Sequence, residues 1–363
     1  MMYSTGNAPQ NLMPPAGAKV LIAMSGGVDS VAAAVLLTRA GYQCMGATLR
    51  MTAEPATKPV FEPCCGLQAA EDARYACEQI GIPHRTIRVV EDFDKHIITP
   101  FAKQYAMGRT PNPCIRCNRM IKFGLLFRYA REWGYDFIAM GHYVRMVGRN
   151  GRMGLRRSTN RNKDQSYVLA PLTQPQLRRS CFPLGNMTKD EARSLASAIS
   201  PRVGEKAESQ EICFVADRNY ARIVEERQGD APPGRIVDVH GNVLGIHKGI
   251  HHYTIGQRRG LGISASEPLY IVAIDANSNT ITIGRDEQSL CASFTTGPLF
   301  WGAIPPQETI FTVLVQLRYR HEPVPASIAP YPGGAKIYME TPQRAVTPGQ
   351  WAVFYDEDGY VLA

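Results

Sequence analysis

The chain has 363 residues, of which 44% are hydrophobic and 20% charged, a composition typical of a folded globular protein. This length exceeds one ordinary domain, so we expect two or three domains, each with its own core. A formal net charge of +8 favours a polyanionic partner, with nucleic acid ahead of an anionic membrane surface. No apolar run is long enough to span a membrane, and residues 1–17 lack a hydrophobic signal core, which predicts a cytoplasmic protein with a flexible N-terminal tail over 1–17.

The first half of the chain alternates between strand and helix patterns. A short apolar run over 19–24 predicts a strand buried on both faces of a parallel sheet. A helix follows over 31–40 and ends at Gly41, a predicted left-handed cap. The later strands are predicted over 43–49, 84–89 and 137–140, and the later helices over 69–80, 93–105 and 121–133. Such alternation predicts a doubly wound α/β fold.

In the second half of the chain, the alternation of strands and helices gives way to short β-rich segments. A helix is predicted over 189–199, and after Pro232 the chain breaks into short β-rich runs separated by glycines. Strands are predicted over 270–275, 280–284, 309–319 and 351–355. Closely spaced short strands predict a terminal β-barrel or sandwich.

Residues 25–30, Ser-Gly-Gly-Val-Asp-Ser, stand between the first predicted strand and its helix. Glycines let the backbone approach a phosphate, and the unpaired amides of a helix start point at negative charge. The Gly-Lys-Ser/Thr ending of a Walker A loop is missing. The hexapeptide matches the signature of the ATP pyrophosphatase superfamily, and that resemblance implies that the loop grips pyrophosphate, with Asp29 near a magnesium ion. The alternative is a Gly-rich turn without a ligand.

Nine cysteines in a chain without a secretion signal argue against a disulfide framework. Cys44, Cys77, Cys181 and Cys291 stand singly in apolar or helical surroundings, where packing is expected. Cys114 and Cys117 form a C-x-x-C in a Pro-rich loop before a helix, which can lower thiol pKa or hold a soft metal. Cys213 supplies a third thiol. We interpret Cys64 and Cys65 as a solvent-facing pair without a role, the alternatives being a spare ligand or a sulfur-relay thiol.

From about residue 19 to its end, the chain closely resembles bacterial tRNA-specific 2-thiouridylases. The segments that carry this resemblance are 25–30, 108–113, 117–118, 121–123, 141–143, 163–167, 212–214, 252–262, 318–320 and 347–350. The resemblance implies ATP- and Mg²⁺-dependent replacement of the 2-oxygen of the wobble uridine (position 34) by sulfur. It also implies tRNAs for Lys, Glu and Gln as partners, a cysteine desulfurase or sulfur relay protein as donor, and a monomer.

The same resemblance assigns roles to individual residues. Cys117 matches the catalytic nucleophile, and Cys213 matches the cysteine that carries persulfide sulfur. The ATP-contacting positions are Ala23, Met24, Ser25, Gly26, Gly27, Val28, Asp29, Ser30, Leu49 and Gly141. The tRNA-contacting positions are Asn112, Pro113, His142, Lys163, Asp164, Gln165, Arg318, Tyr319 and Gln350. The implied domains are an ATP-binding catalytic domain over 18–215, a small tRNA-contacting middle domain over 216–283 and a C-terminal β-barrel over 284–363.

Cys114 departs from the family, whose best-known members carry Asp there, so a third thiol joins the expected active site. Cys114, Cys117 and Cys213 could ligate three irons of a 4Fe-4S cluster and leave the fourth open to hydrosulfide. A cluster-free persulfide route and a structural zinc are the alternatives, although zinc normally takes four protein ligands in a closed site.

Several other features have ordinary interpretations. His247, His251 and His252 are expected to form a polar turn without nearby acids. The basic run from Arg156 to Lys163 is usually a solvated face, but beside Asp164 it suits phosphate contact, as does the turn over 256–262. The chain stops without the Gly-rich ending typical of the family, so we expect a weakly held last strand.

Two other functions remain open at this point. One is a different adenylating pyrophosphatase, such as a 4-thiouridine synthetase or an amidotransferase-type synthetase, which would have no use for the Cys117 and Cys213 pair combined with a β-rich tail. The other is a tRNA-binding protein without catalysis, against which the intact phosphate loop argues.

Overall fold

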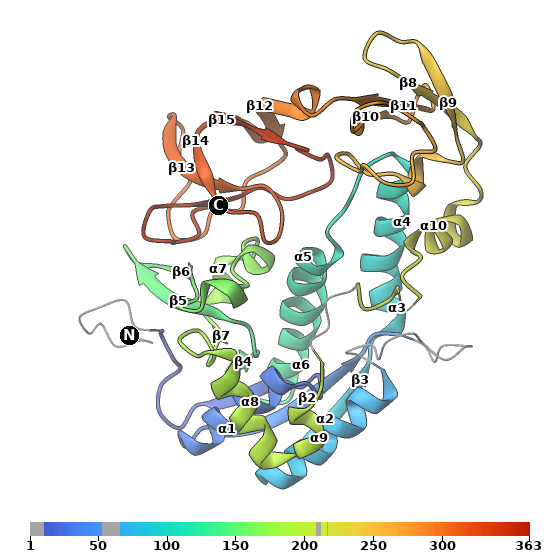
Figure 1. The fold of residues 1–363 in the computed structure, drawn as a ribbon. Coiled ribbons are helices and arrows are strands. Elements are labelled where there is room, and N and C mark those ends of the chain that lie inside the picture. Colours follow the sequence, from blue (N-terminus) through green and yellow to red (C-terminus); the bar gives the residue numbers. More distant parts are fainter. Residues whose placement is uncertain (1–10, 53–65, 208–211, 216) are drawn as a thin grey trace.

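The computed structural model describes residues 11–52, 66–207, 212–215 and 217–363. In Figure 1 the parallel sheet and its helices form the lower half, and two β-rich units form the upper half. Cys64 and Cys65 lie outside the described residues. None of the described helices combines the length and the apolar character that crossing a membrane requires.

The lower half is built on a five-stranded sheet in the order β3-β2-β1-β4-β7, and every pairing in it is parallel. Its strands are β1 (Lys19–Ala23), β2 (Gln43–Arg50), β3 (His84–Arg88), β4 (Phe137–Ala139) and β7 (Ser180–Cys181). The central strand β1 carries Val20, Leu21 and Ile22, all fully buried, as its unbroken apolar run predicts.

Helices cover both faces of this sheet (Figure 1), which confirms the doubly wound fold. One layer holds α1 (Val28–Arg39), α2 (Leu67–Ile80), α8 (Lys189–Ile199) and α9 (Pro201–Gly204). The other holds α5 (Pro113–Cys117), the π-helical η2 (Asn118–Leu125) and α6 (Leu126–Glu132). Gly41, just past the end of α1, has φ +81°, as predicted for a left-handed cap.

Two predicted helices begin earlier than the sequence indicated. The helix expected over 93–105 is preceded by α3 (Val90–Phe93) and continues as the π-helical η1 (Asp94–Ile98) and α4 (Thr99–Ala106). The helix expected from 121 begins at Pro113, because the Asn112 side chain accepts from the backbone amides of Cys114 and Ile115. The C-x-x-C is therefore inside a helix and not in a loop.

A hairpin that the sequence analysis missed joins the two halves. It pairs β5 (Val144–Arg149) with β6 (Arg152–Arg157) around Asn150 and Gly151, which have φ +50° and +75°. Asn-Gly is a strong hairpin signal because both residues tolerate positive φ. The flexible tail expected over 1–17 is wrong for its last part: the Asn11 side chain donates to Phe182 O (2.6 Å) and accepts from Met146 N (2.8 Å).

The upper half contains two sheets. The middle sheet has the order β10-β11-β8-β9 and a core that includes Ile236, Ile271 and Ile281. Its strands are β8 (Gly234–Val237), β9 (Val243–His247), β10 (Tyr270–Asp275) and β11 (Thr280–Gly284), of which the last two have the predicted bounds. The terminal antiparallel sheet has the order β12-β15-β14-β13-β16, with β12 (Leu290–Thr296), β13 (Phe311–Gln316), β14 (Val324–Tyr331), β15 (Gly334–Arg344) and β16 (Val353–Tyr355).

Short elements connect these units. They are α7 (Gln174–Leu177), α10 (Tyr220–Gln228) and the 3₁₀ turns η3 (Arg161–Lys163), η4 (Tyr167–Leu169), η5 (Ile250–His252) and η6 (Glu287–Ser289). In Figure 1, α4 runs from the parallel sheet towards the middle sheet, with α10 beside it.

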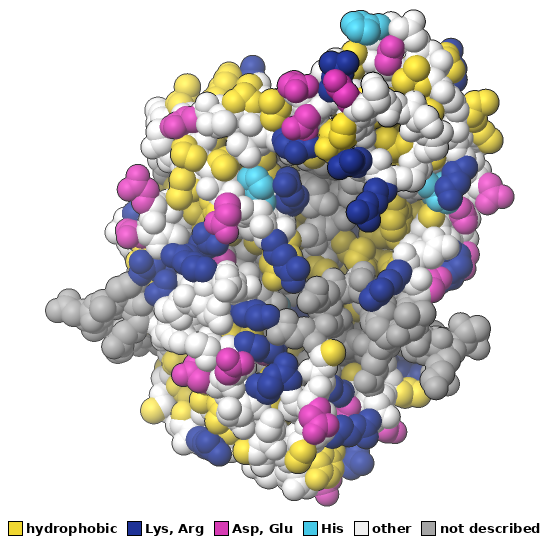
Figure 2. All heavy atoms as spheres, viewed as in Figure 1, with side chains coloured by type: hydrophobic (Ala, Val, Ile, Leu, Met, Phe, Trp, Pro, Cys, Tyr) yellow, Lys and Arg dark blue, Asp and Glu magenta, His cyan; other side chains and the backbone are white. Residues whose placement is uncertain are grey.

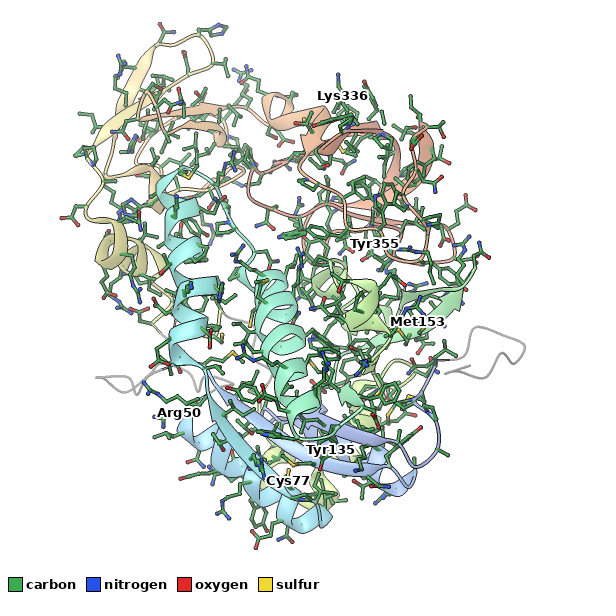
Figure 3. The ribbon with its side chains drawn as sticks, turned by 180° about the vertical axis from the view of Figure 1, so that it is seen from behind. Arg50, Cys77, Tyr135, Met153, Lys336 and Tyr355 are labelled. Atoms are coloured by element: carbon green, nitrogen blue, oxygen red, sulfur yellow. The ribbon has the colours of Figure 1, made fainter. Side chains whose placement is uncertain are left out.

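The last residues are firmly held, so the expectation of a weak final strand is wrong. Val361 N donates to Leu155 O and Leu362 N to Phe354 O, and residues 361–363 are buried. Tyr355, in the neighbouring strand β16, lies between the terminal strands and the region of Met153 (Figure 3). Its hydroxyl is 3.0 Å from Ser166 Oγ, which ties the terminal sheet to the half that contains the parallel sheet.

We predict that Gly46→Ala destabilises the parallel sheet. A Cβ at Gly46, on β2, would meet Cys77 Sγ of α2 and lie 3.1 Å from Met24 Cγ. Cys77 is fully buried (Figure 3), and burial raises the pKa of its thiol to about 12, as expected for a packing cysteine. Overpacking of this kind costs about 1–3 kcal/mol in the free energy of unfolding, measurable by urea denaturation. Gly297→Ala is the control, because a Cβ there meets nothing within 4 Å, and an equal loss in both variants would contradict the prediction.

Candidate functional site

The phosphate loop 25–30 leaves β1 and turns directly into α1. Ser30 Oγ donates to Gly27 O (2.9 Å) and accepts from Ser25 N (3.2 Å), which closes the turn. Gly26 has φ +66°, and a Cβ there would collide with the backbone carbonyl of Ala69 on α2. The loop is therefore shaped by packing on α2, and its glycine is required by both conformation and space.

Asp29 is held at the start of α1 by two partners. Its Oδ1 accepts from Tyr143 Oη (2.8 Å) and from Lys189 Nζ (2.7 Å), and the carboxylate is 36% exposed. Gly141 approaches the same backbone so closely that a Cβ there would lie 2.5 Å from Asp29 O. Both of these hydrogen bonds go to Oδ1.

The predicted ATP-contacting residues converge because parallel strands end at one edge. Residues 23–30 follow β1, Leu49 is near the end of β2, and Gly141 comes two residues after β4. β1 pairs with both β2 and β4, so the three strand ends are neighbours. The carboxyl edge of such a sheet is where α/β proteins bind nucleotides.

Two lysines that the sequence analysis missed also reach this loop. Lys189, in the first turn of α8, bonds Asp29, and Lys206 Nζ donates to Gly26 O (3.1 Å) while also pairing with Asp72. Both side chains are largely covered, at 14% and 21% exposure. They add positive charge where an anionic ligand would sit. Because both lysines are far from the loop in the sequence, no local sequence pattern predicts their contact with it.

Cys117 lies at the same sheet edge. Its side chain is 7% exposed, and its Sγ is 4.0 Å from Sδ of Met51, the residue after β2. Cys114, one turn earlier on α5, is exposed at the surface. The helix thus presents one thiol to the interior and one to solvent.

Cys213 is half-buried and packs with Phe214 against the core that contains Cys117. The Phe214 ring makes edge-to-face contacts with Phe93 and Phe101, at 5.7 and 5.1 Å between centroids. The Sγ atoms of Cys114, Cys117 and Cys213 do not all lie within 4.8 Å of one another. Three thiolates on one tetrahedral zinc would be about 3.8 Å apart, so this arrangement does not fit the zinc alternative.

Gln350 connects the terminal half to the helix of the two cysteines. Its Nε2 donates to Thr110 O (2.9 Å), and Thr110 N donates to Pro348 O (2.9 Å). Gly349 between them has φ +95°, and a Cβ there would lie 3.0 Å from the Thr110 backbone. Residues 347–350 therefore fasten the segment that leads into Asn112 and Pro113.

Asp164 and Gln165, both predicted to contact tRNA, face inward in this structure. The Asp164 side chain is 5% exposed and accepts from Arg157 Nε, Ser158 N and Ser166 Oγ. Gln165 Oε1 accepts from Tyr143 N at 3.0 Å. Their observed contacts hold the segment between the hairpin and the terminal sheet together.

The other predicted tRNA-contacting residues divide by exposure. Arg318 and Tyr319 are exposed, with the Tyr319 ring 6.2 Å from that of Tyr167, and Lys163 is half-buried. His142 packs against Phe123 and Phe182, and its Nδ1 is buried without a hydrogen-bond partner among the described residues. Burial, and then the nearby Lys122 charge, hold the pKa of His142 well below its ordinary value, so the imidazole is neutral.

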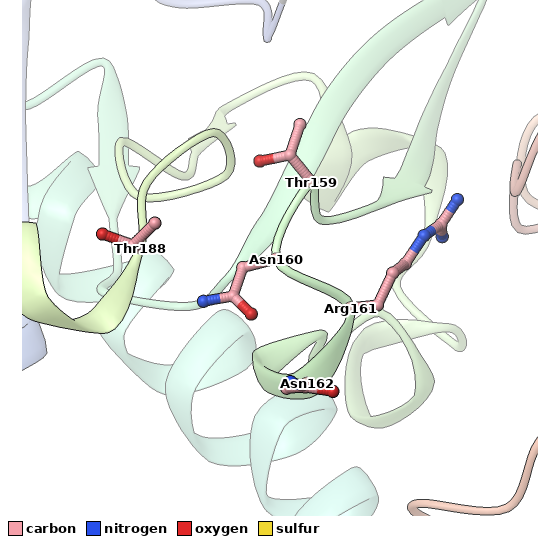
Figure 4. A pocket seen from close by; sticks show the side chains of 5 residues that line it. All are labelled: Thr159, Asn160, Arg161, Asn162 and Thr188. Atoms are coloured by element: carbon pink, nitrogen blue, oxygen red, sulfur yellow. The ribbon is translucent and has the colours of Figure 1, made fainter.

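The surface around these residues is basic and hollowed. Figure 2 shows Lys and Arg side chains spaced around the central hollow between the two halves. A shallow pocket of about 470 Å³ is lined by residues 159–162 and by Thr188, next to the Asp29 partner Lys189 (Figure 4). A second pocket, of about 460 Å³, is formed by the segment 258–269 of the middle unit.

Fold and loop together define a doubly wound α/β protein with a loop of the pyrophosphatase type, followed by two β-rich units. Family models described as "tRNA methyl transferase HUP domain", "tRNA methyl transferase PRC-barrel domain" and "Aminomethyltransferase beta-barrel domain" match residues 18–217, 222–285 and 292–362. The fold is thus a doubly wound domain, a small middle domain and a C-terminal β-barrel.

Close relatives cover almost the whole chain. The tRNA-specific 2-thiouridylase MnmA of Trichlorobacter lovleyi is 45% identical over 94% of this chain and 95% of that protein. Those of Geotalea uraniireducens and Acetivibrio thermocellus are 45% and 42% identical, over 94% of this chain and 92% and 96% of theirs. The chain belongs to the tRNA-specific 2-thiouridylase family, as the sequence motifs implied.

We predict that Asp164→Asn destabilises the fold. Asn keeps the size but loses the charge that Arg157 and two further donors share, and breaking a buried pair of this kind costs about 3 kcal/mol. Thermal and urea unfolding measure the change. Asp358→Asn is the matched control, because Asp358 is 75% exposed and 3.9 Å from Arg156, and its loss should stay below about 0.5 kcal/mol. Equal stability of Asp164→Asn and the unmodified protein would show that the inward contacts contribute nothing.

Proposed function

We propose that this protein replaces the 2-oxygen of the wobble uridine (position 34) of tRNA with sulfur, consuming ATP and releasing AMP and pyrophosphate. One observation carries the proposal: an adenylating phosphate loop and a sheltered thiol meet at one sheet edge. The loop follows β1, and Cys117 contacts Met51 at the end of the neighbouring strand β2. Membership of the 2-thiouridylase family supports the choice of substrate and reaction.

In this proposal residues 25–30 bind the pyrophosphate portion of ATP through backbone amides and hydroxyls. Asp29 presents Oδ2 to Mg²⁺, since Oδ1 is engaged by Tyr143 and Lys189. Lys189 and Lys206 neutralise phosphate charge as it develops. The remaining predicted ATP contacts, Leu49 and Gly141, lie at the adjacent strand ends and shape the nucleotide pocket.

The chemical step needs an activated oxygen and a sulfur nucleophile. A uridine carbonyl oxygen is a poor leaving group until adenylation converts it to an ester from which AMP departs. In the persulfide route, the terminal sulfur of a Cys213 persulfide attacks C2 and AMP leaves. The Cys117 thiolate then attacks the Cys213 sulfur, which releases 2-thiouridine and forms a Cys117–Cys213 disulfide that cellular thiols reduce.

Cys114 supports a second route. Three thiols from one helix and one later segment can hold three irons of a 4Fe-4S cluster, whose ligands are farther apart than those of a single ion. Such a cluster would supply an open iron for hydrosulfide.

We assign tRNA to the basic hollow between the two halves (Figure 2). The exposed Arg318 and Tyr319 and the half-buried Lys163 suit contact with the RNA backbone and bases, and Asn112, Pro113 and His142 are assigned to the tRNA as well. The predicted domains 18–215, 216–283 and 284–363 then act as catalytic, middle and clamping units of one cytoplasmic monomer. A cysteine desulfurase or relay protein supplies the sulfur.

Methyl transfer is the competing function, because two of the matching family models carry that description. Methylation has no use for a pyrophosphatase loop beside a thiol, whereas thiolation uses both. The chain's relatives with 42–45% identity are likewise called thiouridylases.

We predict that tRNA thiolation with ATP and a persulfide or sulfide donor falls at least 100-fold in Cys117→Ser and in Cys213→Ser, because each removes a sulfur that the chemistry needs. Mass spectrometry of tRNA nucleosides measures the product. Cys291→Ser is the control and should leave the rate unchanged, since Cys291 lies on β12, where its thiol donates to Ser293 O.

Asp29→Asn should abolish pyrophosphate release, whereas the cysteine variants retain it. Methylated and unthiolated tRNA would overturn the proposed function.

We predict that the effect of Cys114→Ala on iron content and thiolation activity distinguishes the cluster route from the persulfide route. Protein purified and reconstituted without oxygen is assayed for iron, sulfide and thiolation, alongside Cys114→Ala. About four irons per chain, lost together with activity in Cys114→Ala, indicate the cluster route. Iron-free protein that thiolates from a persulfide donor and tolerates Cys114→Ala indicates the persulfide route.

A further inference from the structure

Three metal-ligating side chains converge outside the proposed active site. Glu225 lies on α10, and His251 and His252 lie in η5, between strands β9 and β10 of the middle sheet. Their ligand atoms all lie within 4.8 Å of one another, and among the described residues this is the one group of three His, Cys, Asp or Glu side chains that does so. The sequence analysis expected a histidine turn without acids, because Glu225 is more than 20 residues earlier in the chain.

The geometry aims both imidazoles at one point. His251 Nε2 and His252 Nε2 lie 3.1 and 3.2 Å from the same Glu225 Oε1, and the two rings are 4.2 Å apart at 37°. Gly249 has φ +136°, and a Cβ there would lie 2.9 Å from His251 Cε1, so the ring is packed from behind. The two nitrogens are thus fixed before any ligand arrives.

The exposed fraction of the side chain increases from His251 through His252 to Glu225. The side chain of His251 is 2% exposed, that of His252 18% and that of Glu225 34%. An ion could therefore reach the carboxylate from solvent, bind the two imidazoles inside and keep an open position for water. Two imidazoles and one carboxylate with an open position form a common zinc ligand set.

We propose that Glu225, His251 and His252 bind one divalent transition metal ion, of the zinc class, that joins α10 to the segment between β9 and β10. This proposal is independent of the proposed function. Nitrogen-rich ligands select zinc, cobalt or nickel over magnesium and calcium, which prefer all-oxygen sites. The site matters because α10 follows the segment of Cys213 and packs on α4, whereas η5 lies between strands β9 and β10 of the middle sheet.

The test is a titration of the full chain with Zn²⁺ and with Co²⁺ as a spectroscopic probe. Cys114, Cys117 and Cys213 could compete for either ion, so the titration uses both the unmodified protein and a variant with these three residues changed to Ser. We expect one equivalent to bind in the triple variant, with a cobalt spectrum free of thiolate charge-transfer bands. Zn²⁺ should also raise the unfolding temperature.

Ligand variants and a control locate the ion. In the triple-variant background, Glu225→Gln and His252→Ala should each weaken binding at least tenfold and remove the thermal shift. His240→Ala, an exposed histidine of the same unit, should change neither. Glu225→Gln keeps a hydrogen-bonding side chain, so it tests the site even if His252→Ala unfolds. Unchanged affinity in Glu225→Gln, or no binding at submillimolar Zn²⁺ in the triple variant, would overturn the proposal.

Discussion

The parallel pairing of β1 with β2 and β4 is the constraint on which the site depends. Because three adjacent strands end at one edge, the phosphate loop, Leu49 and Gly141 are neighbours without any direct bond between them. The same edge places Met51 beside Cys117. Backbone topology therefore brings the phosphate loop and Cys117 to one edge, and side chains such as Tyr143 and Lys189 hold Asp29 there.

The second constraint is the attachment of the terminal domain. Residues 347–350 bind both backbone groups of Thr110, two residues before the Asn112 cap of α5. A cap fixes where a helix begins, so it also fixes the positions of Cys114 and Cys117. Separation of the terminal domain would free the start of that helix, which makes the β-barrel part of the framework that positions the two cysteines.

The sequence predicts features that have a local signal. The bounds of α8 and of β10 and β11 agree with the structure, because a capping box starts the helix and a turn separates the strands. Partners distant in sequence leave no such signal: Lys189 bonds Asp29 across 160 residues, and Glu225 meets His251 across 26. The roles of the site residues themselves came from resemblance, and stay predictions.

The residues assigned to tRNA combine two physical kinds. Arg318 and Tyr319 are exposed and can touch RNA directly. Asp164 and Gln350 instead form hydrogen bonds with other residues of the protein. Under the proposed function, substitution of either kind would lower tRNA modification. The free energy of unfolding separates the two kinds, because loss of an inward residue lowers it and loss of an outward residue does not. The residues assigned to tRNA in the proposed function therefore divide into exposed side chains available for contact and a buried polar network that holds them in place.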